Sequence, residues 1–338
     1  MSPPKLPFPT AFPTAFPTAF PTAFPTAFPT AFPTAFPITF LFIFLFGCIP
    51  EVGPPASLLD GPRVLAMRSE PAEVYPGESV RLDLTIADRT GPITTASVDW
   101  AFCSAPKPPT ENNVISDRCL RDEVRSIGGH GLAVMAQVPV DACALFGPEL
   151  PPSAAGDMVP RPRDPDHSGG FYQPVRARVL GLTAIGLVRI RCGLSGASQE
   201  TAAAFRARYL PNRNPSGGPL SATEEETPIS LAAVPAGHSI RFALAVSEDS
   251  RESFLWFDPT DQELKLVPEQ LRVSWLAGQG SFLRSATTHD AADSHTIHNE
   301  WIAPEQAGPV MLWTVLRDSR GGVTVYSHSV QVMAAGPS

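Results

Sequence analysis

The sequence predicts an all-β fold in which two similar sandwich domains follow each other, with one short helix near the end of the first domain. In GESVRLDLTIAD, residues 77–88, apolar residues occupy every second position, which is typical of a half-buried strand. The phrase returns as GHSIRFALAVSED at residues 237–249. Each copy is followed by a short apolar strand with one tryptophan, Trp100 in SVDWAF and Trp275 in RVSWLA. Two domains of the same kind explain both repeats, and we expect the two tryptophans to fill their cores.

The N-terminal region is predicted to be an export signal. The tetrapeptide FPTA runs from Phe8 to Ala35, and a proline at every fourth position excludes an α-helix there. An apolar run from Ile38 to Phe46 follows. At about 1.5 Å per helical residue this run is roughly half as long as a membrane span requires, so it fits the hydrophobic core of a signal peptide. Residues 1–47 are therefore predicted to be a signal peptide that contains the FPTA repeat.

The end of this region, LFGC, resembles the lipobox of bacterial lipoproteins, with Leu45, Gly47 and Cys48 at its characteristic positions. The bulky Phe46 and a leader with little positive charge depart from the pattern. The resemblance implies that Cys48 is lipidated with palmitate-type acyl chains, becomes the new N-terminus and anchors the protein in the bilayer. A non-cleaved or differently cleaved export signal and a mispredicted start are the alternatives. Ile49 after the cysteine favours the outer membrane.

Composition shifts suggest how the remaining chain is divided. The predicted parts are a tether at 48–62, a first domain at 63–211, a linker at 212–226 and a second domain at 227–338. In the first domain, Ser198 is the expected N-cap of a helix over Thr201–Ala207, which ends before Pro211. Because the join is polar and each half has its own alternating strands, we expect the halves to fold independently.

The cysteines indicate disulfide bonds. Besides Cys48 the chain has four, and an even number in an exported protein suggests two disulfides. Three pairings are possible, and we favour Cys103 with Cys119 and Cys143 with Cys192. Four free buried thiols are the alternative. A metal site is less favoured, because no two of these cysteines form a C-x-x-C motif.

The last strands show a hairpin and a change of pattern. PVMLWTVLRD and VTVYSHSVQVM are joined by SRGG, whose glycines suit a tight turn. In the return strand Val323 and Val325 share one face, whereas Val330 and Val332 share the other, which predicts a β-bulge near Val325. A second hairpin is predicted in FLWFDPTDQELKLV, residues 254–267.

The strand VYPGESVRL, followed by a strand with an inward tryptophan, resembles the B and C strands of immunoglobulin-like sandwiches. APEQAGPVMLWTVLRDSRGGVTVYSHSVQV, residues 303–332, is similar to the F and G strands of cell-surface modules. On these segments the chain resembles uncharacterised bacterial lipoproteins with tandem immunoglobulin-like domains. The resemblance implies an immunoglobulin-like fold and an envelope location. It brings no catalytic residue, because such modules share no common site.

Few sequence patterns point to chemistry. The usual nucleophile, phosphate-binding and metalloprotease motifs are absent from the sequence. A net charge of −8 without a basic run argues against nucleic acid. The sharpest candidate is THDAADSHTIHNE, where His289, His295 and His298 could bind Zn²⁺. Against this, His295 and His298 are an odd number of residues apart and would face opposite sides of a strand.

The sequence therefore favours a non-enzymatic, membrane-anchored binding or structural module without a cofactor. Its expected partners are the bilayer, through Cys48, and an envelope protein or glycan. We expect the loops at 105–123 and 146–170, or the His-rich loop, to bind the latter, since long polar loops often carry function. An exposed strand edge is the alternative binding surface. The alternative is a metal-dependent envelope enzyme, or an accessory domain of one, that uses the His-rich loop.

Overall fold

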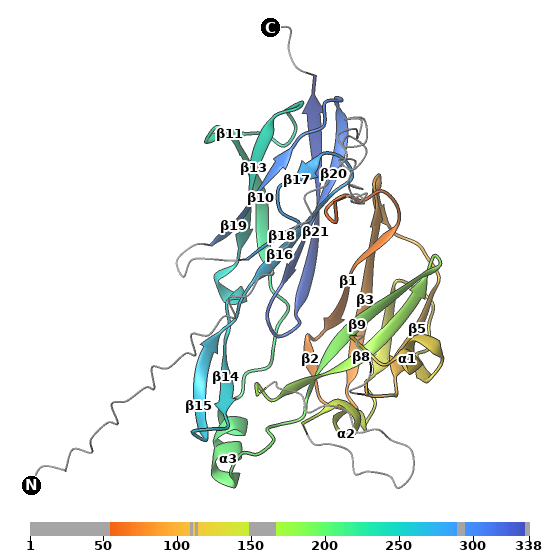
Figure 1. The fold of residues 1–338 in the computed structure, drawn as a ribbon, viewed down its shortest axis with the longest axis vertical. Helices are drawn as coiled ribbons and strands as arrows, with labels where there is room; N and C mark the ends of the chain where they lie inside the picture. Colours follow the sequence, from red (N-terminus) through yellow and green to blue (C-terminus); the bar gives the residue numbers. More distant parts are fainter. Residues whose placement is uncertain (1–54, 109–110, 112–113, 149–166, 289–294, 335–338) are drawn as a thin grey trace, which may run out of the picture. The chain divides into compact units, whose positions relative to one another are not determined.

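Two β-sandwiches of the immunoglobulin-like kind follow each other along the chain, which confirms the predicted fold class (Figure 1). The computed structural model describes residues 55–108, 111, 114–148, 167–288 and 295–334. The FPTA repeat and Cys48 lie outside the described residues. The described residues belong to one compact unit.

The first sandwich packs a four-stranded sheet against a five-stranded one. In the smaller sheet the central strand β3 pairs with the other three strands. Its members are β1 (Arg63–Glu70), β3 (Ser79–Asp88), β4 (Gly91–Ile93) and β7 (Ala133–Gln137). The larger sheet has the order β2-β9-β8-β5-β6. Its members are β2 (Glu73–Val74), β5 (Val98–Cys103), β6 (Val124–Ser126), β8 (Gly170–Val179) and β9 (Leu182–Arg191).

The second sandwich packs two five-stranded sheets together. One has the order β11-β10-β13-β19-β17. Its strands are β10 (Gly217–Glu224), β11 (Thr227–Ile229), β13 (Ser239–Val246), β17 (Ser281–Phe282) and β19 (Thr296–Ile302). The other has the order β12-β21-β20-β16-β18. Its strands are β12 (Val234–Pro235), β16 (Arg272–Ala277), β18 (Ala286–Thr288), β20 (Gly308–Arg317) and β21 (Val323–Met333).

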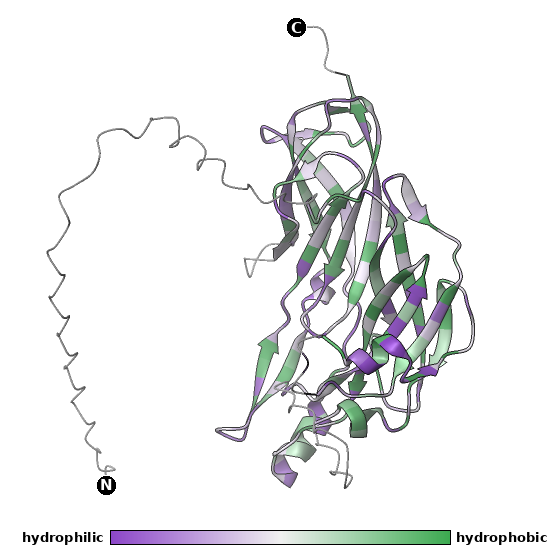
Figure 2. Ribbon diagram, turned by 45° about the vertical axis from the view of Figure 1, so that its right-hand side comes forward, coloured by the Kyte–Doolittle hydropathy of each residue, from purple (hydrophilic) through white to green (hydrophobic). Residues whose placement is uncertain are grey.

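The repeated sequence phrase occupies the same structural place in both sandwiches. It begins at Gly77 and Gly237, whose φ angles of 86° and 75° are rare for residues with a Cβ atom. The strands that follow, β3 and β13, bury their alternate apolar residues in the same order, and Figure 2 shows apolar positions alternating with polar ones along the strands. Trp100 and Trp275 are buried in the two cores, as predicted. The two copies of the phrase therefore form equivalent strands in two domains of the same kind.

Helix α3 (Gln199–Arg208) confirms the predicted helix. Its N-cap is Ser198, whose hydroxyl accepts a hydrogen bond from the Thr201 N–H at 3.1 Å. The sequence did not predict the two short α-helices α1 (Asp117–Arg121) and α2 (Ala142–Phe146) or the 3-10 helix η3 (Glu248–Ser250).

The predicted linker, residues 212–226, requires a correction. Residues 217–224 form β10, which pairs with β13 as an edge of the second sandwich. The glycines, proline and acidic residues of this stretch are typical of a loop, but Leu220 and Ala222 alternate inward and are buried. Glu225 and Glu226, with φ angles of 44° and 68°, then form the tight turn between β10 and β11.

The β-bulge predicted near Val325 is also wrong, because β20 and β21 pair from Arg317–Val323 to Gly308–Val332 without a change of register. The residue pattern changes for another reason. Val330 and Val332 face the core of the second sandwich. Val323 and Val325 face the opposite side, where they pack in a cluster with Leu65 of the first sandwich. Both faces of β21 are therefore covered, at different points along the strand.

The second predicted hairpin is present and reaches from the second sandwich to the first. Strands β14 (Ser253–Asp258) and β15 (Glu263–Pro268) form a two-stranded sheet with each other, and Figure 1 shows them beside α3. Phe257 is fully buried and its N–H donates to the carbonyl of His167 at 3.0 Å. The imidazole of His167 packs edge-on against Trp256.

Candidate functional site

The predicted anchor and metal residues are only partly within the described structure. Cys48 and His289 lie outside the described residues. His295 lies 3.6 Å from Glu248, with both side chains exposed. The ring of His298 contacts the Thr296 hydroxyl at 3.0 Å. No group of three metal-ligating side chains occurs among the residues that the structure describes, so His295 and His298 are not brought together with a third ligand there.

The four remaining cysteines form the favoured pairs, Cys103 with Cys119 and Cys143 with Cys192. The first bond ties α1 to the end of β5, and the second ties α2 to the end of β9. Part of the 105–123 segment is thus built around α1 rather than being an open loop. Residues 149–166 of the other predicted loop lie outside the described residues.

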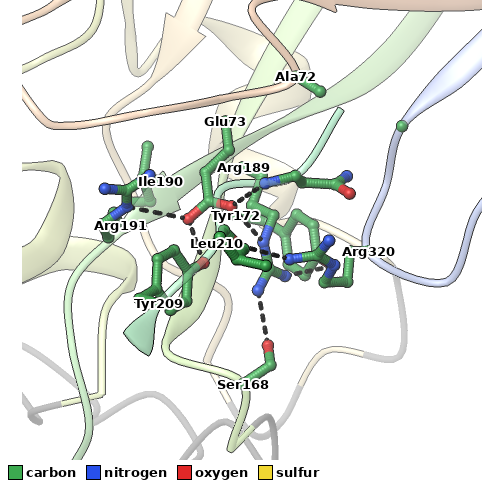
Figure 3. A network of polar contacts seen from close by, with 12 residues as sticks. Ala72, Glu73, Ser168, Tyr172, Arg189, Ile190, Arg191, Tyr209, Leu210 and Arg320 are labelled. Carbon is green, nitrogen blue, oxygen red and sulfur yellow. Dashed lines mark hydrogen bonds and ion pairs between the residues drawn. The ribbon is translucent and has the colours of Figure 1, made fainter. Parts of the chain in front are cut away.

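A buried charge network lies where the two sandwiches meet, and its first half centres on Glu73 of β2 (Figure 3). The Glu73 side chain is fully buried. Its carboxylate accepts hydrogen bonds from Arg189 Nε at 3.3 Å, from Arg191 Nε at 3.4 Å and from the Tyr209 hydroxyl. The backbone N–H of Asn212 also donates to it, at 2.9 Å. Each carboxylate oxygen is therefore occupied by protein donors.

The two arginines of β9 are held by further partners. Arg189 donates to the Ser168 hydroxyl at 2.6 Å and to the Tyr172 hydroxyl at 3.1 Å. The guanidinium of Arg191 lies between the rings of Tyr75 and Tyr209, at 4.5 and 4.6 Å from their centroids. Such cation–π contacts add to the ion pair with Glu73 and fix the plane of the Arg191 side chain.

The second half of the network centres on Arg320, in the turn between β20 and β21. Its side chain is 2% exposed. It donates to Glu269, and to Glu252 at 2.7 Å; these two residues flank the β14–β15 hairpin. It also donates to the carbonyl of Leu210 at 3.1 Å. Asp318 accepts from the backbone N–H groups of Arg320 and Gly322, each at 2.8 Å.

The connecting segment 209–214 joins the two halves. Tyr209 and the backbone N–H of Asn212 bind Glu73, whereas the Asn212 side chain donates to Asp318 at 3.4 Å. Asn214 donates to the carbonyl of Ser69 at 2.8 Å and accepts from the N–H of Val323 at 2.9 Å. We call the charged and polar groups of this network the junction cluster. Its members are Glu73, Arg189, Arg191, Tyr209, Asn212, Glu252, Glu269, Asp318 and Arg320.

Burial shifts the acid–base properties of the junction cluster. It raises the pKa of Glu269 to about 7, and nearby Asp318 adds to this effect. Burial is also the main cause of the raised pKa values of Asp318 and Glu252. The pKa of the Tyr209 phenol is raised by burial and by the charge of Glu73. All four shifts disfavour the negatively charged form, as expected for acidic groups that are removed from water.

The junction cluster is suited to holding the two sandwiches in one arrangement. Its arginines and carboxylates are engaged by protein groups, so a ligand would have to displace them. Breaking a buried ion pair by removing one partner is costly, because an uncompensated charge is left behind. We conclude that it positions the sandwiches relative to each other.

Sequence reasoning missed the junction cluster, although one signal was present. In GLVRIRC two arginines, Arg189 and Arg191, occupy alternate positions of an otherwise apolar strand. They therefore share one face, and charged residues on such a strand require buried partners. The partners come from segments distant in sequence, such as Glu73 and the 209–214 segment, and no short-range pattern identifies them.

No helix within the described residues is long and apolar enough to cross a membrane.

Comparison with known proteins identifies no family. The chain matches no family model and no curated protein. Among solved structures it is similar to the adhesin InvE of Yersinia pseudotuberculosis, at 10% identity over 83% of this chain and 61% of that one, with a TM-score of 0.22. For Escherichia coli alpha-2-macroglobulin activated by porcine elastase, the identity is 10% over 82% of this chain and 22% of that one, with a TM-score of 0.24.

A third similar structure is invasin, described as a bacterial integrin-binding protein. The identity is 11% over 81% of this chain and 39% of that one, with a TM-score of 0.22. The chain thus spans less than two thirds of each of these three structures. TM-scores of this size do not establish a shared fold. The fold of the chain is established by its own sheets.

Proposed function

We propose that the protein is a non-enzymatic binding or structural module of the cell envelope, anchored by a lipid on Cys48. In this proposal the two sandwiches are displayed from the outer membrane as one unit and bind an envelope protein or glycan. The bilayer is reached through the acylated cysteine, and the FPTA repeat is removed with the signal peptide.

The observation that carries the proposal is the pair of disulfides, Cys103 with Cys119 and Cys143 with Cys192. Structural disulfides form and persist outside the reducing cytoplasm. The LFGC sequence that ends at Cys48 supports export and lipidation. The junction cluster supports a structural or binding role, because it fixes the arrangement of two sandwiches.

Metabolic labelling with a clickable palmitate analogue tests the anchor. We expect wild-type protein to be labelled and to fractionate with membranes, whereas Cys48→Ser should remain an unlabelled precursor that retains the FPTA repeat. Cys143→Ser is the matched control, because it removes a cysteine from a disulfide and should still be labelled. Labelling of Cys48→Ser, or a mature wild-type protein that retains the repeat, would refute the lipid anchor.

A further inference from the structure

A groove with a volume of about 810 Å³ runs between strand β1 and strand β9 of the first sandwich. Among the described residues, β1 pairs with β3 alone. β9 pairs with β8 along its whole length, and on its other side its described partner is β2, at Arg189 and Ile190. In the part of the chain that the structure describes, the residues of β9 from Leu182 to Leu187 therefore form an open sheet edge along the groove.

The pattern of the β8–β9 hairpin shows which backbone groups face the groove. Leu180 and Gly181, with φ angles of 50° and 76°, form a two-residue turn, and Val179 pairs with Leu182 next to it. The residues flanking such a turn bond to each other, and the bonding direction then alternates along the strand. The N–H and C=O groups of Thr183, Ile185 and Leu187 thus point away from β8.

This edge lacks the features that usually protect an exposed strand. Residues 182–187, LTAIGL, contain no charge and no proline, whereas natural sheet edges commonly carry one or the other. The outward groups of Thr183, Ile185 and Leu187 have no backbone partner within the described structure. An extended peptide could therefore pair with them as an additional strand.

Three arginines near the groove lack a carboxylate partner. Arg63 and Arg317 line the groove, and Arg272 pairs directly opposite Arg317 across strands β16 and β20. The guanidinium of Arg317 donates to Ser274 Oγ at 3.3 Å and to the carbonyl of Leu65 at 3.0 Å. Within the described residues no carboxylate forms an ion pair with any of the three arginines.

This local charge is unusual in a protein whose net charge is −8. Burial and the charge of Arg272 lower the pKa of Arg317, and like charges directly opposite on neighbouring strands destabilise a sheet. The carboxylate of Asp318 also lines the groove, but it is 9% exposed and engaged by the N–H groups of its own turn. The groove therefore favours an anionic occupant.

We propose that this groove binds an extended acidic peptide segment of a protein partner, which adds as a strand to the open edge of β9 and places a carboxylate against Arg317. The proposal rests on the proposed function and specifies the chemistry of the partner. The strand edge supplies sequence-tolerant main-chain bonds, and the arginines select acidic side chains.

Selection from a displayed library of random short peptides on the mature wild-type protein tests the proposal, followed by calorimetric titration of selected peptides against variants. Thr183→Pro removes one outward N–H, and a proline is tolerated on an edge strand at such a position. Thr183→Ala is its matched control. Arg317→Gln removes the guanidinium that is proposed to bind a carboxylate of the peptide. Arg241→Gln, at an exposed position on β13, is the control for loss of a positive charge.

We expect selected peptides to be rich in Asp or Glu and in β-branched residues, and to bind at least about tenfold more weakly to Thr183→Pro and to Arg317→Gln. The two controls should bind like wild type. Binding should also slow hydrogen exchange of the Ile185 and Leu187 amides, a result that does not depend on any variant folding.

The proposal fails if no acidic peptides are enriched, if the exchange of these amides is unchanged, or if Thr183→Pro binds as well as wild type. Binding of a sulfated oligosaccharide in place of any peptide would likewise overturn it. Affinity capture from envelope extracts separates this failure from failure of the proposed function. If wild type and Thr183→Pro retain the same partners equally, the proposed envelope function stands, but the groove is not the binding site.

Discussion

Arg320 is the residue whose removal should affect the junction most. Its guanidinium compensates Glu269 and Glu252 and holds the carbonyl of Leu210. We expect Arg320→Met to lower the free energy of unfolding by about 3–5 kcal/mol, because buried carboxylates lose their cation. Urea unfolding measures this loss.

A double variant shows whether the cost comes from charge. Arg320→Met with Glu269→Met removes both partners of one ion pair and should recover part of the lost stability. Arg241→Met, at an exposed position, should change stability by less than about 0.5 kcal/mol. If Arg320→Met is as stable as wild type, the junction cluster does not hold the sandwiches.

Glu269 should make stability depend on pH. Its pKa of about 7 in the folded protein lies above its usual value of 4.5, so the folded state binds a proton between these values that the unfolded state releases. The stability from this group is present below pH 4.5 and is lost as the pH rises through 7. We expect the urea midpoint of wild type, relative to that of Glu269→Gln, to be higher at pH 5.5 than at pH 8.

The conservative variant Glu269→Gln isolates this effect, because the amide keeps an oxygen for Arg320 but does not titrate. Relative to this variant, wild type should lose stability as the pH rises from 5.5 to 8. Burial lowers the pKa of His328 to about 4 and also lowers that of His298, so these groups act with the opposite sign in this interval. They are present in both proteins and cancel in the comparison. Equal slopes for wild type and Glu269→Gln would show that Glu269 is not the responsible group.

At the level of elements, strands were predictable where a single face is buried. β3 and β13 follow the period-two pattern, and the turn glycines and the α3 cap are local signals that require no tertiary context. β10 was not predicted, because its glycines, proline and acidic residues are typical of a loop and only two apolar side chains mark it as a strand. The pattern of β21 was misread because its second buried face is covered by the other sandwich. Such coverage depends on contacts between distant segments, as does the junction cluster.

The β14–β15 hairpin offers a matched pair of substitutions at the same scale. Phe257 in β14 is fully buried, whereas Leu266 in β15 is 65% exposed. We expect Phe257→Ala to cost about 3–5 kcal/mol of unfolding free energy, because it leaves a cavity under the hairpin. Leu266→Ala should cost less than about 1 kcal/mol. Equal losses in urea unfolding would mean that the hairpin is not packed as described.

At the level of the whole molecule, the contacts favour cooperative unfolding over the independent folding expected from the sequence. The two sandwiches share the junction cluster and an apolar cluster that includes Leu65, Trp313 and Val323. We expect tryptophan fluorescence and far-UV circular dichroism to report one coincident transition under oxidising conditions. Two well-separated transitions would show that the sandwiches unfold as independent domains.

The intact mass of the protein isolated from membranes, measured with and without a thiol-reactive reagent, tests the lipid anchor and the disulfides together. We expect a chain that begins at an acylated Cys48, lacks the FPTA repeat and gains no label, because Cys103, Cys119, Cys143 and Cys192 are paired. A mass that includes the repeat, or a chain that takes up label at these four cysteines, would contradict the account of an exported, lipid-anchored envelope module.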